Sequence, residues 1–168
     1  MTEDGFLYRV DLGLRPGGGK STIAVPVEGA LEHYFYWGDT WERAAMIKAR
    51  PIAGDISLGE KFISDIEPFV YKKFLDYSSI EDLKDMKTRL DQLEKKRDVK
   101  LGKGGIREIE FFVQALALVN GGEIKYIREN NTLKALGKLE AANLITPQVR
   151  RTLSDSYLFL RKVEHNIQ

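Results

Sequence analysis

A chain of 168 residues with 43% apolar and 30% charged side chains has the size and composition of one globular domain, or of two small units that share an interface. The formal net charge of +1 excludes a global field for nucleic acid, and the absence of cysteine excludes disulfides, a thiolate nucleophile and a cysteine zinc site. No apolar run approaches the roughly 20 residues that span a bilayer. We therefore expect a cytoplasmic protein that binds neither nucleic acid nor membrane.

The start of the chain has the alternating pattern of β-strands. Apolar and polar residues alternate over 6–15, which predicts a strand with one buried face. Residues 16–19 contain a proline and three glycines that turn the chain, and 21–27 form a second candidate strand that ends near Pro26. Together these segments predict a β-hairpin.

Two helices are predicted next. Asp39 and Glu42 have the spacing of a capping box and predict a helix over 39–50, which Pro51 and Gly54 end. A second helix is predicted over 59–76, interrupted or begun afresh near Pro68.

The segment from residue 77 is predicted to be a separate helical unit, with a boundary near residue 76. Ser78 and Glu81 form another capping-box pattern, and helices are predicted from 77 to about 93, over 106–119, over 133–143 and from 147 to the last residue. The charges of 84–98 are interpreted as a solvated helix face. No stop signal precedes the chain's end, so we expect a longer polypeptide. The fold class is α+β, mostly α, with a helical bundle at residues 77–168.

A glycine-rich loop leads into the helix predicted from residue 106. Gly104 and Gly105 come directly before Arg107, Glu108 and Glu110. Glycines ahead of a helix N-terminus favour an anion such as phosphate, because backbone N–H groups converge there. The charged side chains can equally form salt bridges that brace the helix, and the segment alone leaves both interpretations open.

Residues 17–21 imitate a phosphate-binding P-loop because they end in Gly-Lys-Ser. A P-loop requires glycine at the position of Leu14, and it requires a helix after Ser21, where the sequence predicts a strand. Both the spacing and the following element exclude a P-loop ATPase or kinase.

Asp11 is the candidate metal ligand. Strand alternation places it on one face with Arg9 and Arg15. A carboxylate between arginines is usually structural, but a carboxylate on a strand is also what metal-assisted phosphoryl transfer requires.

A basic stripe follows on the helix predicted over 39–50. Arg43, Ile47 and Arg50 share the stripe, and Lys48 is displaced from it. These cations can bind phosphate or pair with acids.

Five phrases in one order resemble a known enzyme family. They are 8–16 (YRVDLGLRP), 41–50 (WERAAMIKAR), 69–76 (FVYKKFLD), 104–111 (GGIREIEF) and 159–165 (FLRKVEH). The chain thereby resembles the glutamine synthetase adenylyltransferase/adenylyl-removing family, and the wording of 45–50 is similar to its N-terminal, AMP-removing half. The resemblance covers nearly the whole chain.

The resemblance implies a fold and a division of the chain. Residues 1–76 would be the C-terminal portion of a nucleotidyltransferase domain related to DNA polymerase β, and residues 77–168 a helical bundle domain like that of PII-uridylyltransferase. Asp11 would be the third metal carboxylate of the nucleotidyltransferase site. The first two aspartates of the family pattern have no counterpart before Asp11, so we expect this chain to be inactive alone.

The resemblance also implies the chemistry. Inorganic phosphate would attack the AMP group on a tyrosine of glutamine synthetase, with Mg²⁺ as cofactor and ADP as product, or ATP as substrate in the opposite reaction. Asp11 would be catalytic. The other candidate phosphate- or nucleotide-binding residues are Arg15, Arg43, Lys48, Arg50, Gly104, Gly105 and Arg107, and Glu108 and Glu110 would belong to the site or brace it.

The implied partners are glutamine synthetase and a PII signal protein, and the implied process is the regulation of nitrogen assimilation. A function of another class stays open: the chain can be a non-catalytic docking module, in which the helical part receives a signal protein.

Overall fold

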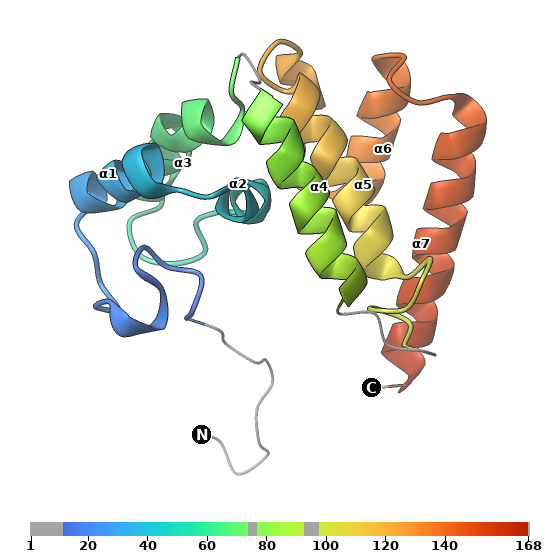
Figure 1. The fold of residues 1–168 in the computed structure, drawn as a ribbon, viewed down its shortest axis with the longest axis horizontal. Helices are drawn as coiled ribbons and strands as arrows, with labels where there is room; N and C mark the ends of the chain where they lie inside the picture. The colour runs from blue at the N-terminus through green and yellow to red at the C-terminus, as the bar shows by residue number, and fades with distance from the viewer. Residues whose placement is uncertain (1–11, 74–76, 93–97, 168) are drawn as a thin grey trace.

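The computed structural model describes residues 12–73, 77–92 and 98–167, and the regular elements in these ranges are helices (Figure 1). The α-helices are α1 (Val27–Trp37), α2 (Thr40–Met46), α3 (Ile56–Val70), α4 (Tyr77–Gln92), α5 (Ile106–Asn120), α6 (Thr132–Ala141) and α7 (Pro147–Ile167). Short 3₁₀ turns occupy Gly18–Lys20 and Lys125–Ile127. This agrees with the prediction of a mostly α chain.

The predicted hairpin is not found in the described part of the chain. Residues 6–11 of the first strand lie outside the described residues, and 12–15 are irregular. The second predicted strand, 21–27, is wrong: these residues form bends, and α1 begins at Val27 directly after Pro26. Seven alternating residues do not make a strand without a neighbour to pair with, and the Pro26 carbonyl instead accepts the first helical hydrogen bond, from Ala30 (3.0 Å).

Helix α1 was not predicted. Its two buried residues, Ala30 and Tyr34, are four positions apart, which is the helical signal that was available. The surrounding aromatic residues obscured the signal, because the side chains of Tyr36 and Trp37 are 77% and 74% exposed.

The next two helices differ from prediction in their bounds. α2 ends at Met46 rather than Arg50, because the N–H groups of Lys48 and Ala49 bond three residues back, as in a 3₁₀ turn. α3 begins earlier than predicted, at an N-cap where the Asp55 carboxylate accepts from the Leu58 N–H. It continues through Pro68 without interruption and ends at Val70, before the predicted end at residue 76.

The helices after residue 76 match their predicted positions to within a few residues. α6 ends at Ala141, and Asn143 follows in the left-handed region with a φ of 58°. The hydroxyl of Thr146 accepts from the Val149 N–H at the start of α7.

Helices α4–α7 form a bundle, and helices α1–α3 lie together beside it, next to α4 (Figure 1). α2 connects the two groups, because it contacts both α4 and α5. One apolar core crosses the boundary predicted near residue 76. Its buried members are Tyr34, Ala44, Ile47, Ile66, Phe69, Val70, Ala117 and Leu118.

The two glycines after α5 allow the connection from α3 to pass closely. A Cβ on Gly122 would lie 2.1 Å from the carbonyl oxygen of Lys72, and one on Gly121 would lie 2.5 Å from the Tyr71 ring. The guanidinium of Arg128 stacks 4.7 Å from the centre of the same ring. The first helical group is therefore joined to the bundle by close packing as well as by the chain.

Candidate functional site

Asp11 lies outside the described residues, so its metal role stays a prediction. Arg15 is described, and its guanidinium donates hydrogen bonds to the carbonyl oxygens of Gly19 (3.1 Å), Ser21 (2.8 Å) and Leu12. These acceptors all belong to the loop that contains Arg15. The side chain therefore organises its own loop, and phosphate would compete with these carbonyls for the guanidinium.

Arg43 points into the protein interior, where it is only 2% exposed. Its Nε lies 3.1 Å from the carbonyl oxygen of Phe69, and its Nη2 lies 3.1 Å from that of Val70. These are the last carbonyls of α3, where the helix carries partial negative charge. Arg43 thus closes the end of α3.

Lys48 and Arg50 follow α2 and are placed differently. The ammonium of Lys48 donates to the carbonyl oxygen of Asn130 (2.6 Å) and to the hydroxyl of Thr132 (3.0 Å), next to the start of α6. Burial lowers the pKa of Lys48. Arg50 is exposed, so the predicted basic stripe is divided between the interior and the surface.

The backbone donors at the start of α5 are already bonded within the chain. The N–H of Ile106 donates to the carbonyl oxygen of Val99, and that of Arg107 to the carbonyl oxygen of Lys100, both at 3.1 Å. An anion at this helix N-terminus would need these same donors. The geometry therefore favours the bracing interpretation of the glycine loop over an open anion site.

The two glycines of this loop have separate structural reasons. Gly104 has a φ of 73°, in the left-handed region, and its N–H donates to Oε2 of Glu108 at 2.6 Å. A Cβ on Gly105 would lie 2.6 Å from the carbonyl oxygen of Gly102 and 2.8 Å from that of Val99. The turn therefore requires glycine at 104 for conformation and at 105 for space.

Glu108 joins α5 to α4. Its Oε1 accepts from the ammonium of Lys87 at 2.7 Å. The hydrogen bond from Lys87, followed by that from the N–H of Gly104, holds the pKa of Glu108 below its ordinary value. The residue before it, Arg107, is exposed.

Glu110 faces α7 instead. Its Oε1 accepts from the hydroxyl of Tyr157 at 2.9 Å and lies 3.7 Å from Nη2 of Arg161. The first residues of α5 thus form charged contacts with two neighbouring helices, through Glu108 on one side and Glu110 on the other.

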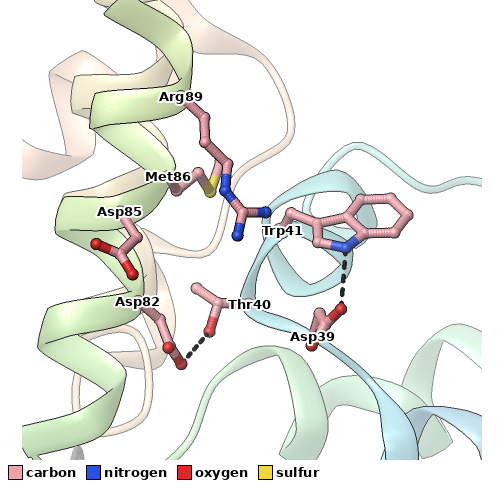
Figure 2. Close-up of a pocket in the computed structure, with 7 residues that line it drawn as sticks. All are labelled: Asp39, Thr40, Trp41, Asp82, Asp85, Met86 and Arg89. Atoms are coloured by element: carbon pink, nitrogen blue, oxygen red, sulfur yellow. Dashed lines mark hydrogen bonds between the residues drawn. The ribbon is translucent and has the colours of Figure 1, made fainter. Parts of the chain in front are cut away.

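A polar pocket between α2 and α4, called here the α2–α4 pocket, was not predicted. It has a volume of about 140 Å³ and is lined by Asp39, Thr40, Trp41, Asp82, Asp85, Met86 and Arg89 (Figure 2). The Thr40 hydroxyl donates to Oδ2 of Asp82 at 2.9 Å, and the indole N–H of Trp41 donates to Oδ2 of Asp39 at 3.3 Å.

Local structure explains why these groups converge. Asp39 caps α2 in the predicted capping box, and its own N–H donates to the Glu42 carboxylate at 2.9 Å, which places Thr40 and Trp41 in the first turn. On α4, Asp82 and Arg89 are seven positions apart and share one face. With three carboxylates, one guanidinium and an indole, the pocket suits a cation or a hydrogen-bond donor better than a phosphate.

The signal for this pocket was present but divided. Trp41 belongs to one of the five family phrases, whereas Asp85 and Arg89 lie within 84–98, whose charges the sequence pattern assigns to a solvated face. Across the described ranges, no group of three or more histidine, aspartate or glutamate side chains is arranged to hold a metal ion. None of the described helices combines the length and the hydrophobicity that crossing a membrane requires.

Comparison with known proteins finds two family models that match successive parts of the chain. Residues 1–65 match the family model for glutamate-ammonia ligase adenylyltransferase. Residues 71–168, more than half of the chain, match the model for GlnD PII-uridylyltransferase. The second match therefore contains the whole helical bundle, from α4 to α7.

Curated relatives match both parts at once. A bifunctional glutamine synthetase adenylyltransferase/adenylyl-removing enzyme from Mesorhizobium japonicum is 45% identical over 174 residues, which cover 99% of this chain and 18% of the relative. Enzymes with the same description from Brucella suis and Rhodopseudomonas palustris (strain TIE-1) are 46% and 47% identical, covering 99% and 98% of this chain and 18% and 17% of their own lengths. The chain belongs to this family, which confirms the resemblance seen in the sequence, and it spans about a sixth to a fifth of the relatives' length.

Proposed function

We propose that this chain is a segment of an enzyme that adds AMP to glutamine synthetase and removes it, and that the segment serves the AMP-removing half. The observation that carries the proposal is the unbroken similarity to bifunctional relatives, which runs across both family matches in one chain. The phrase at 45–50 supports the assignment to the AMP-removing half.

The proposed reaction is a phosphorolysis. An oxygen of inorganic phosphate attacks the phosphorus of the AMP group, the bond to the tyrosine oxygen breaks, and the products are ADP and the free tyrosine. Asp11 would help to hold Mg²⁺, which when bound offsets negative charge on the phosphoryl oxygens. The further metal carboxylates would come from outside this chain.

Among the predicted phosphate-binding cations, Arg50 and Arg107 are the strongest candidates. Both side chains are exposed, and no hydrogen bond or ion pair to another described residue occupies either guanidinium. Arg15, Arg43 and Lys48 instead donate to carbonyl oxygens of the chain itself. Free guanidinium groups are the ones that can form bidentate contacts with phosphate.

The surface of the first helical group supports a role within a larger assembly. Large apolar side chains that are at least 40% exposed gather in this part of the described chain. They are Leu12, Leu14, Ile23, Phe35, Tyr36, Trp37, Trp41, Ile52, Ile56 and Leu58. So many exposed apolar side chains mark a surface that packs against another unit, and we propose that this unit is the remainder of the nucleotidyltransferase domain.

A second candidate function is that of a docking module for a PII signal protein. It is favoured by the match of residues 71–168 to a PII-uridylyltransferase model. The two functions are compatible if the helical part conveys a signal to a neighbouring active site. A cytoplasmic location suits both.

The decisive experiment uses a chimera in which this chain replaces the matching segment of the Mesorhizobium japonicum enzyme. Phosphate-dependent ADP release from adenylylated glutamine synthetase is measured for the chimera, for its Asp11→Asn variant and for this chain alone. We expect activity only in the unmodified chimera. Normal turnover by the Asp11→Asn variant would refute the metal role, and a cooperatively folded chimera that adds AMP but does not remove it would refute the assignment to the AMP-removing half.

A further inference from the structure

The outward side of α5 carries an apolar groove with two hollows, called here the α5 groove. Phe112 stands between them and contributes to both. One hollow has a volume of about 400 Å³ and is lined by Phe111, Ala115, Leu116 and Val119. The other has a volume of about 390 Å³ and is lined by Ile109, Val149 and Leu153, from α5 and α7.

The apolar residues of the groove have the spacing of a helix-packing seam. Phe112, Ala115 and Val119 follow one another at intervals of three and four along α5. This is the spacing at which one helix presents ridges and holes to another. The side chains of Phe112, Val119 and Val149 are 38%, 42% and 37% exposed, so the seam is open to solvent in this chain.

The charges in the groove are satisfied. Its charged lining residues are Lys87 and Glu108, which pair with each other at 2.7 Å, and Lys87 also pairs with Asp91. An occupant therefore meets a neutral, apolar surface. A helix with a neutral apolar stripe fits this surface, whereas a charged peptide would lose hydration without gaining a partner.

We propose that the α5 groove seats one amphipathic helix from the remainder of the longer polypeptide. Two observations favour this occupant over a second copy or a separate protein. More than four fifths of each relative's length lies outside the region that this chain matches. The groove also lies on α5, and α5 packs on α2 of the first helical group. A helix in the groove would therefore contact the bundle at the helix that joins it to the first helical group. Apolar side chains on the docked helix would enter the hollows on both sides of Phe112.

The test uses thiol protection, because the chain contains no cysteine. Val119→Cys places a thiol in one hollow, Val149→Cys places one in the other, and Lys134→Cys on the exposed face of α6 serves as the control. Reaction with N-ethylmaleimide is followed by peptide mass spectrometry in this chain alone and in the chimera described above. Each rate is divided by that of the same peptide in urea.

We expect Val119→Cys and Val149→Cys to react freely in the chain alone. In the chimera their reaction should be slower by a factor of about ten or more. Equal rates in the two contexts would overturn the proposal. Protection in the chain alone would also overturn it, and a dependence of that protection on concentration would identify a second copy as the occupant.

A benzophenone attached to the thiol of Val119→Cys then identifies the occupant in the chimera. Crosslinking to a peptide with apolar residues at three- and four-residue intervals, from outside the segment, is the expected result. Crosslinking to a loop or strand peptide would refute a helical occupant. The two cysteine positions lie in different hollows, so failure of one variant to fold leaves the other measurement intact.

Discussion

The hydroxyl of Tyr157 on α7 donates a 2.9 Å hydrogen bond to the carboxylate of Glu110 on α5, next to the buried pair Ile106 and Ile109. Tyr157 is itself 9% exposed, so the bond lies at the edge of an apolar cluster. It fixes the rotation of α7 against the helix that carries the family phrase at 104–111.

Tyr157→Phe should lower the free energy of unfolding by about 1 kcal/mol, because it removes one hydrogen bond to a charged acceptor and keeps the packing of the ring. Urea unfolding at pH 7 measures the change. The matched control is Tyr126→Phe, since the Tyr126 side chain is 52% exposed, and it should change stability by less than about 0.5 kcal/mol. Equal effects of the two variants would contradict the bracing role of Tyr157.

Arg43→Met should destabilise the protein by roughly 2–4 kcal/mol, since it leaves the buried carbonyl oxygens of Phe69 and Val70 without their donors. The control is Arg50→Met, from the same predicted basic stripe but on the surface, which should change stability by less than about 0.5 kcal/mol. Thermal and urea unfolding measure both. A neutral Arg43→Met variant would show that the guanidinium is not needed to close α3.

Gly105→Ala should destabilise the protein by roughly 2 kcal/mol or more, because the new Cβ would lie 2.6 Å from one backbone oxygen and 2.8 Å from another. Gly137→Ala is the matched control inside α6, where a Cβ meets no atom within 4 Å. It should stabilise by about 0.5–1 kcal/mol through helix propensity. Opposite signs of the two changes are the expected result, and a neutral Gly105→Ala would show that the loop can yield.

Acid should weaken the contribution of Glu108. Its pKa is lowered in the folded state, so the stabilisation is present above the ordinary value of 4.5 and is lost as the pH falls below that value through the lowered pKa. Glu108→Gln should therefore cost less than about 1 kcal/mol at pH 7, because the side chain is partly exposed.

The cost of Glu108→Gln should shrink as the pH falls below 4.5, because the wild-type carboxyl loses its charge as the pH passes through its lowered pKa. Urea unfolding of both proteins at pH 7, 5 and 3 measures the difference. A cost that stays constant over this range would show that the ion pair with Lys87 adds nothing to stability.

Helical periodicity and capping residues determined much of this protein, because they act over neighbouring residues. Asp39 and Glu42 formed the predicted capping box, Thr146 and Pro147 began the last helix, and the five family phrases identified the family. The periodicity and capping signals depend on contacts within one or two turns, which the order of residues controls directly.

Tertiary structure decided what the charged residues do. Arg43 and Arg50 have equivalent places in the sequence pattern, yet Arg43 is buried against the end of α3 and Arg50 is exposed. Only the packing of α2 on α3 brings the carbonyl oxygens of Phe69 and Val70 within hydrogen-bonding distance of the Arg43 guanidinium. Likewise, the loop over 98–105 folds back so that its own carbonyls and Glu108 take the donors that an anion would use. Alternation over residues 21–27 predicted a strand that the structure does not form. A strand needs a partner to bond with, and local sequence cannot supply one.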